Sequence, residues 1–132
     1  MAIIERAMAA QKKNAIIREG KYAIVKTRGK CVPGCFACIN DGREVTLIVK
    51  ESKLFGLKSI KVQKAFKLIT FDMILPFSLV GFIAKITSSL AKAKIPIFVI
   101  SAYSTDHLLI KEKYLEKAKI ILTKIGFKVI EE

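Results

Sequence analysis

The sequence lacks the residue groupings on which most catalytic sites depend. It has a single histidine, His107, and the only acids within its apolar stretches are Asp72 and Asp106. Neither a Ser–His–Asp arrangement nor a pair of carboxylates suited to acid–base chemistry is visible. We therefore expect no catalytic residues and no cofactor.

Long apolar runs are also missing. The longest, residues 68–84, is interrupted by Asp72 and Pro76, and it is shorter than the roughly 20 residues that a membrane-spanning helix needs. The N-terminus has no basic region followed by an apolar core, as a signal peptide would. We expect no membrane partner and a cytoplasmic location.

Arginine is scarce although the chain is strongly basic. The net charge is +13, yet only four of the 24 Lys and Arg residues are arginines. Nucleic-acid-binding proteins favour arginine and cluster their charge, whereas the lysines here occur in every stretch, mostly on the polar side of amphipathic patterns. We interpret them as a solvated surface. A basic nucleic-acid-associated protein is the alternative that the charge leaves open.

The cysteines are few and closely spaced. Cys31, Cys35 and Cys38 follow the pattern C-x3-C-x2-C, which is also the spacing of the cluster ligands in radical S-adenosylmethionine enzymes. Those enzymes need a large barrel that 132 residues cannot supply, and no fourth cysteine is present. Three cysteines cannot all pair, which disfavours a disulfide scaffold, so we expect small buried thiols and no metal. A metal- or Fe–S-binding redox module using these cysteines is the alternative.

The second half of the chain has a clear periodicity. Its pattern predicts six elements in the order strand, helix, strand, strand, helix, strand. They are strand 64–72, a helix from an N-cap at Ser78 to about 93, strands 97–102 and 108–111, helix 112–124 capped by Gly126, and strand 127–130. This β-α-β-β-α-β order is ferredoxin-like and places the chain in the α+β class.

The first half is less regular. Residues 1–20 suggest a short helix or arm that ends at Gly20. Residues 21–27 and 44–50 are strand-like, residues 59–62 suit a short strand, and residues 29–42 are irregular or form a helical turn. The composition, with 52% apolar residues, supports either one compact domain or two small packed halves.

Three segments of the second half form a recognisable set. They are LVG at 79–81, LAKAKI at 90–95 and ISAYSTDHLLI at 100–110, with YAIV at 22–25 and EVTLIV at 44–49 as weaker companions. Together they resemble the ACT domain, and within it the two-module subfamily similar to the regulatory tail of aspartate kinases and to CASTOR-type amino-acid sensors. The resemblance covers residues 20–130 and is strongest after residue 64.

The resemblance implies an organisation and a role. Residues 1–20 would be an N-terminal helix or arm, residues 21–62 a degenerate ACT-like module, and residues 63–132 a ferredoxin-like ACT domain. The protein would be a non-catalytic regulator that binds a free amino acid between neighbouring ACT modules. It would form a homodimer and act on an enzyme or transporter partner.

The resemblance also implies where the amino acid would bind. The carboxylate would meet the helix start at Ser78, Leu79, Val80 and Gly81. Free backbone N–H groups and the helix dipole favour an anion there, and a glycine lets it approach closely. Asp106 would pair with the ammonium group. Residues 44–47 of the other module would line the facing side.

The polar segment 102–106 would supply the remaining contacts. Tyr103 would wall the pocket, and Ser104 or Thr105 would add hydrogen bonds. Ala102 stands where the family often has threonine, and His107 where an aromatic residue is common, so the ligand contacts differ from the usual pattern. Ser, Thr and Asp also suit an ordinary hairpin turn, which is the alternative interpretation. We expect His107 to be a packed strand residue.

Overall fold

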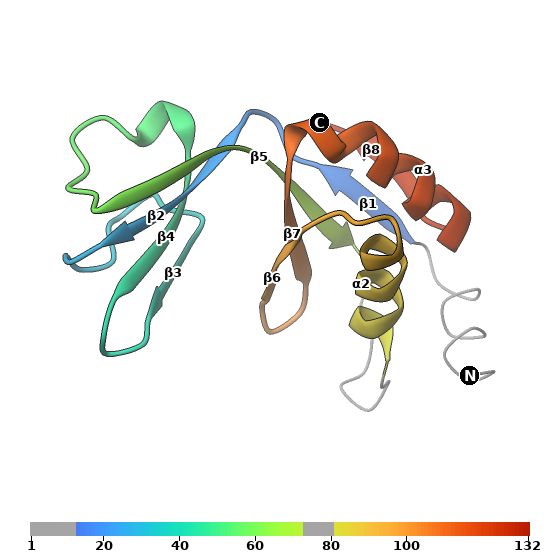
Figure 1. Cartoon of the computed structure of the whole chain (residues 1–132), viewed down its shortest axis with the longest axis horizontal. Coiled ribbons are helices and arrows are strands. Elements are labelled where there is room, and N and C mark those ends of the chain that lie inside the picture. The colour runs from blue at the N-terminus through green and yellow to red at the C-terminus, as the bar shows by residue number, and fades with distance from the viewer. Residues whose placement is uncertain (1–12, 73–80) are drawn as a thin grey trace. The chain divides into compact units, whose positions relative to one another are not determined.

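The computed structural model describes residues 13–72 and 81–132 (Figure 1). They divide into two compact units. The N-terminal unit comprises residues 20–67, and the C-terminal unit combines residues 13–19 with residues 68–72 and 81–132. The strand β5 (Lys61–Asp72) contributes its first half to one unit and its second half to the other.

The C-terminal unit contains the predicted α+β arrangement. After β5 come α2 (Phe82–Lys92), β6 (Phe98–Ser101), β7 (Asp106–Lys111), the short 3-10 helix η2 (Glu112–Tyr114), α3 (Leu115–Ile125) and β8 (Lys128–Glu131). The β-α-β-β-α-β order expected from the sequence is therefore confirmed. Gly126 ends α3 in the left-handed region at φ 117°, as the pattern predicted.

An additional strand, β1 (Asn14–Ile17), completes the sheet of this unit. It lies between β5, to which it is antiparallel, and β8, to which it is parallel, so the strand order is β6-β7-β5-β1-β8. A helix or arm was expected for residues 1–20, and a helix is wrong over residues 14–17, whereas residues 1–12 lie outside the described residues. Hydrogen-bonding partners supplied by distant segments outweigh the weak local helical preference of the sequence.

The core of the C-terminal unit lies between its sheet and both helices. Because side chains alternate along a strand, one face of the sheet meets α2 and α3, and its side chains join those of the two helices in one buried cluster. The cluster contains Ala15, Ile17, Ile69, Phe71, Ile86, Leu90, Ile95, Leu108, Ile110, Ala118, Leu122 and Phe127. We call the opposite side of this sheet the helix-free face.

The N-terminal unit is an antiparallel sheet in the order β3-β4-β2-β5. Its strands are β2 (Tyr22–Thr27), β3 (Ala37–Asn40), β4 (Val45–Lys50) and the first half of β5, with a short 3-10 helix, η1 (Glu51–Lys53). The strands expected at 21–27 and 44–50 are confirmed, and residues 20–67 contain no α-helix. The assignment of this region as a degenerate ACT-like module stays a prediction.

Two local predictions in this unit are wrong. The short strand expected at 59–62 and the strand expected from 64 are parts of one 12-residue strand, β5. At Ala65 the backbone turns into the left-handed region, φ 66°, and the pairing register with β2 shifts nearby, so the alternating pattern is interrupted without ending the strand. Strand β3 lies in the segment expected to be irregular because its partner, β4, fixes it.

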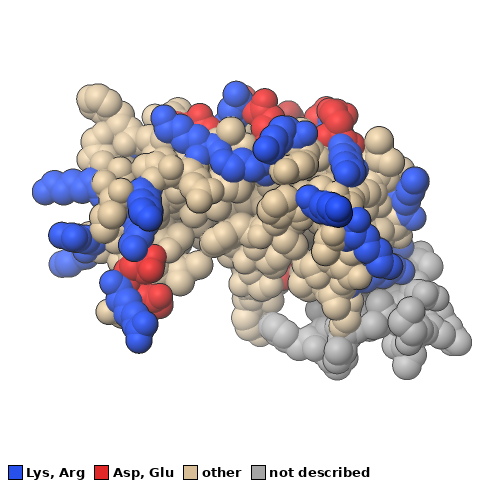
Figure 2. Space-filling view, viewed as in Figure 1, with Lys and Arg blue, Asp and Glu red and all other residues tan. Residues whose placement is uncertain are grey.

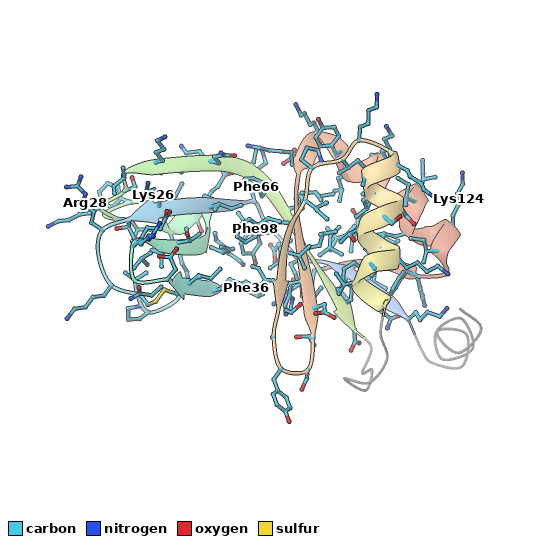
Figure 3. All side chains as sticks on the ribbon, turned by 60° about the horizontal axis from the view of Figure 1, so that its bottom comes forward. Lys26, Arg28, Phe36, Phe66, Phe98 and Lys124 are labelled. Atoms are coloured by element: carbon cyan, nitrogen blue, oxygen red, sulfur yellow. A yellow bond between two sulfur atoms is a disulfide. The ribbon has the colours of Figure 1, made fainter. Side chains whose placement is uncertain are left out.

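Cys31 and Cys38 form a disulfide (Figure 3), whereas Cys35 is a free thiol. The expectation of three buried, reduced thiols is therefore wrong. The chain between β2 and β3 turns back so that the Cα atoms of the two cysteines lie 5.7 Å apart, within the usual range for a disulfide. Cys35 packs half-buried against the core of this unit.

Candidate functional site

The start of α2 differs in detail from the predicted one. Its N-cap is Gly81 rather than Ser78, and Ser78, Leu79 and Val80 lie outside the described residues. Gly81 has φ 98° and ψ −1°, a conformation that side chains disfavour. Among the described residues, no side chain caps this helix end by a hydrogen bond, and the first turn carries no acidic residue. Its first backbone N–H groups therefore suit an anion.

Residues 102–105 form the predicted hairpin turn between β6 and β7. Ser101 pairs with Asp106 at the ends of the two strands, and the Ala102 N–H donates to the Thr105 carbonyl oxygen at 2.8 Å. Tyr103 stands at the tip with 87% of its surface exposed. The described residues of both predicted parts thus belong to the C-terminal unit: Gly81 is the N-cap of α2, and residues 102–106 lie in the hairpin.

The structure places a hydrogen-bonded chain behind this hairpin. His107, on β7, is buried with 8% of its surface exposed, as expected for a packed strand residue. Its Nδ1 lies 2.9 Å from the Thr70 hydroxyl oxygen on β5, and its Nε2 lies 2.9 Å from the Thr105 hydroxyl oxygen at the end of the turn. The imidazole therefore bridges a buried threonine and a threonine of the predicted site.

Arg18 anchors the inner end of this chain. Its Nη1 donates to the Thr70 hydroxyl oxygen at 3.2 Å, and its Nε lies 3.2 Å from a carboxylate oxygen of Glu132. Burial, and then the positive charge of Arg18, lower the pKa of His107, while Asp106 opposes them. Both effects favour the neutral form of the imidazole.

Strand alternation explains why these residues meet. Ala15, Ile17, Ile69, Phe71, Leu108 and Ile110 point toward the helices, so the intervening residues of the same strands occupy the helix-free face. Thr70 and His107 are among them, although 37 positions separate them in sequence. The isolated histidine was a signal for this cluster. Its partners were not foreseeable because they depend on the register of β1, β5 and β7.

The comparison with known families decides the class of this unit. A family model described as the ACT domain matches residues 61–124. The chain contains an ACT domain. The match includes α2, the β6–β7 hairpin and His107, whereas Arg18 lies before it in sequence.

Solved structures share the fold over most of the chain. Protein Atu0741 from Agrobacterium tumefaciens is 20% identical, with a TM-score of 0.79 over 92% of this chain and 95% of its own. VC0802 from Vibrio cholerae, a protein of unknown function described as a possible transport protein, is 21% identical, with a TM-score of 0.73 over 96% of this chain and 99% of its own. These coverages exceed either unit alone, so the likeness in fold extends beyond the ACT domain.

The regulatory parts of aspartate kinases share this fold as well. The ligand-free regulatory subunit of the Thermus thermophilus aspartate kinase is 13% identical, with a TM-score of 0.59 over 83% of this chain and 95% of its own. The resemblance to the ACT domain and, in fold, to aspartate kinase regulatory domains is thus confirmed. No curated protein matches the sequence.

The cysteines lie outside the ACT domain and do not form the ligand set that a metal- or Fe–S-binding redox module would need. Two of the three sulfur atoms are bonded to each other, which leaves Cys35 alone. Within residues 13–72 and 81–132, no group of three or more His, Cys, Asp or Glu residues is placed to hold a metal ion. The arrangement therefore offers no support for a cluster in this oxidised state.

The distribution of charge gives little support to a nucleic-acid interface. On the face shown in Figure 2, the basic side chains are spread over the surface with a few acidic ones among them, rather than gathered into a single patch. A distributed surface of this kind is what the sequence predicted from its lysines. Neither α2 nor α3, the α-helices of the described ranges, has the length and apolarity to cross a membrane.

Proposed function

We propose that this chain is a non-catalytic regulatory protein whose ACT domain binds a free amino acid. The observation that supports the proposal is the helix start at Gly81, where no side chain of the described residues caps the backbone donors, in the same unit as the hairpin that carries Asp106. The printed descriptions of the aspartate kinase matches, a regulatory subunit and a putative regulatory domain, agree with a regulatory role.

The two charged ends of an amino acid would need opposite partners in this unit. The first turn of α2 offers N–H groups and the positive end of the helix dipole to the carboxylate. Ser78, Leu79 and Val80 belong to the proposed contacts through the family resemblance. Asp106, half-buried at the first position of β7, would pair with the ammonium group by a charge-assisted hydrogen bond.

The hairpin would give the site its shape. Tyr103 and Ser104 form the tip of the turn, while Ala102 and Thr105 close it through their backbone hydrogen bond. Thr105 is half-buried, and its hydroxyl adds a polar contact beside Asp106. Since Ala102 lacks the hydroxyl that is common there in the family, we expect one side-chain hydrogen bond to the ligand fewer at this position.

Calorimetric titration of the full chain with each of the twenty amino acids tests the proposal. At least one should give saturable heat, and Asp106→Asn should weaken that binding by about tenfold or more, since it removes the charge from a hydrogen-bonded ion pair. Glu116→Gln is the matched control. It removes one negative charge from the exposed surface of α3, where an ion pair with Lys119 contributes little.

The outcomes separate clearly. Heat within noise for all twenty amino acids, from a protein whose circular dichroism shows it folded, would refute amino-acid binding. Equal weakening by Asp106→Asn and Glu116→Gln would refute the placement of the ammonium group at the hairpin and leave a general charge effect.

We also propose that the protein forms a homodimer, because the family resemblance implies a binding site shared between neighbouring modules. Strands β6 and β8 end the sheet of the C-terminal unit, and Val99 and Ile120 expose apolar surface there and on α3. Sedimentation equilibrium at micromolar concentration should give twice the 14.7 kDa chain mass. A single species at that chain mass would contradict the proposal. The regulated partner would be an enzyme or a transporter.

A further inference from the structure

The chain Arg18–Thr70–His107–Thr105 has a direction that follows from counting protons. An arginine guanidinium only donates hydrogen bonds, so the Thr70 hydroxyl oxygen must accept from Arg18. Thr70 keeps one hydroxyl hydrogen of its own. It is buried at 8% exposure, and within the described part of the chain its remaining hydrogen-bond partner is Nδ1 of His107.

This arrangement selects one form of the histidine. If Nδ1 carried the proton, the Thr70 hydroxyl would face it as an acceptor, and its own hydrogen would be buried without an acceptor, which is costly. With the proton on Nε2, Thr70 donates to Nδ1 and Nε2–H donates to the Thr105 hydroxyl oxygen at 2.9 Å. The Thr70 hydroxyl and both ring nitrogens of His107 are then satisfied.

The consequence appears at Thr105. Its oxygen accepts from His107, so its own hydrogen is directed away from the imidazole. We propose that His107 is a positioning residue that holds the Thr105 hydroxyl as a hydrogen-bond donor toward a carboxylate oxygen of the bound amino acid. This inference rests on the proposed function and deepens it, because it assigns a second, side-chain donor to the carboxylate.

The charges around His107 support this donor-to-acceptor direction of the hydrogen-bonded chain. Arg18, directly after β1, donates to Thr70 and is itself paired with Glu132. Asp106, next to His107 on β7, favours the protonated ring, whereas burial and Arg18 disfavour it. On β6, the residue opposite His107 is the uncharged Ile100. The positive charge of Arg18 therefore lies at the Thr70 end of the hydrogen-bonded chain, and a ligand acceptor would lie at the Thr105 end.

The first measurement reads the tautomer without any ligand. Because His107 is the only histidine, the ring nitrogens of protein labelled with ¹⁵N-histidine give unambiguous signals. At neutral pH we expect Nε2 to be protonated and Nδ1 to be bare. A protonated Nδ1 would overturn the proposed direction.

The second measurement uses whichever of the twenty amino acids binds the wild type, together with its carboxamide. Thr105→Val should weaken binding of the amino acid by about tenfold or more, as expected for loss of a hydrogen bond to a charged group, and should change binding of the carboxamide much less. Thr105→Ser, which keeps the hydroxyl, is the control and should stay within about threefold of the wild type. An unchanged dissociation constant in Thr105→Val would overturn the proposal.

Variants of His107 distinguish positioning from mere packing. His107→Phe cannot donate to Thr105 and should weaken binding about as much as Thr105→Val, with no additional loss in the double variant, because both remove one interaction. His107→Gln keeps one acceptor and one donor and should retain most of the affinity. Additive losses would overturn the positioning role. If no amino acid binds the wild type, the proposed function fails, and the tautomer alone then decides the direction of the chain.

Discussion

The disulfide between Cys31 and Cys38 makes a quantitative prediction about stability. It closes a short loop, since seven positions separate the two cysteines. In the chain-entropy description, a loop of this length restricts the unfolded chain enough to stabilise the folded state by about 2.4 kcal/mol near room temperature. Replacing both cysteines by serine should lower the unfolding free energy of the N-terminal unit by about this amount.

The structure gives a second reason for a measurable effect. Val32 and Cys35 lie in the loop that the disulfide closes, and both pack against the cluster formed by Ala23, Val25, Val45, Leu47 and Val49. Cys38 belongs to β3, which in the described part of the chain pairs with β4 alone and forms an edge of the sheet. Without the covalent link, the loop and the edge strand are held by noncovalent contacts alone, so loss of these contacts becomes easier.

Urea denaturation followed by far-ultraviolet circular dichroism provides the assay. Oxidised wild-type protein, wild-type protein in excess dithiothreitol, and the variant Cys31→Ser/Cys38→Ser are compared, with Cys35→Ser as the matched control. The reduced wild type and the double variant should have the same midpoint, below that of the oxidised wild type. Oxidised and reduced wild-type curves that coincide, with thiol counting confirming the two states, would refute the reasoning.

Three further predictions concern stability. The unfolding free energy should fall as the pH drops below the ordinary histidine pKa of 6.5, because the unfolded chain takes up the proton first. This loss of unfolding free energy should amount to at most about 1.4 kcal/mol per pH unit. It should be absent when His107→Gln is unfolded with urea across the same pH range. An identical pH profile in that variant would contradict the prediction. Leu122→Ala, at a buried position of α3, should cost about 2–5 kcal/mol in the same assay, whereas Ile120→Ala, at 58% exposure, should cost much less; equal costs would contradict the assigned core. Gly126→Ala should cost about 1–3 kcal/mol because φ there is 117°, while Gly29→Ala, where the added methyl meets only an ordinary contact, should be close to neutral.

The ACT domain could be predicted in considerable detail because its signals are local. Helical spacing of Ile86 and Leu90, the capping glycine Gly126 and the polar turn at 102–105 each depend on residues that are neighbours in sequence. These features produced the correct element order and the correct hairpin. Asp106 could be singled out for the same reason, although its role is a proposal.

The failures depend on strand pairing or on backbone conformation. Residues 14–17 form a strand because β5 and β8 hydrogen-bond to them, and β3 exists because β4 lies beside it. The start of α2 moved to Gly81 because its backbone adopts a left-handed conformation that the sequence alone does not fix. In each case the local preference was weak, and strand pairing or the backbone conformation at the helix start decided the outcome.

The class of the protein can be read from the sequence alone: its periodicity predicts an α+β unit, and its motifs resemble the ACT domain, whose family model matches residues 61–124. The contacts of His107, by contrast, follow from the fold. The sequence does not show which groups a single histidine contacts, but the β-sheet register brings Arg18, Thr70 and Thr105 into one hydrogen-bonded chain with it. Because hydrogen bonds act only over short distances and have a donor and an acceptor, that alignment turns four separate residues into one oriented chain.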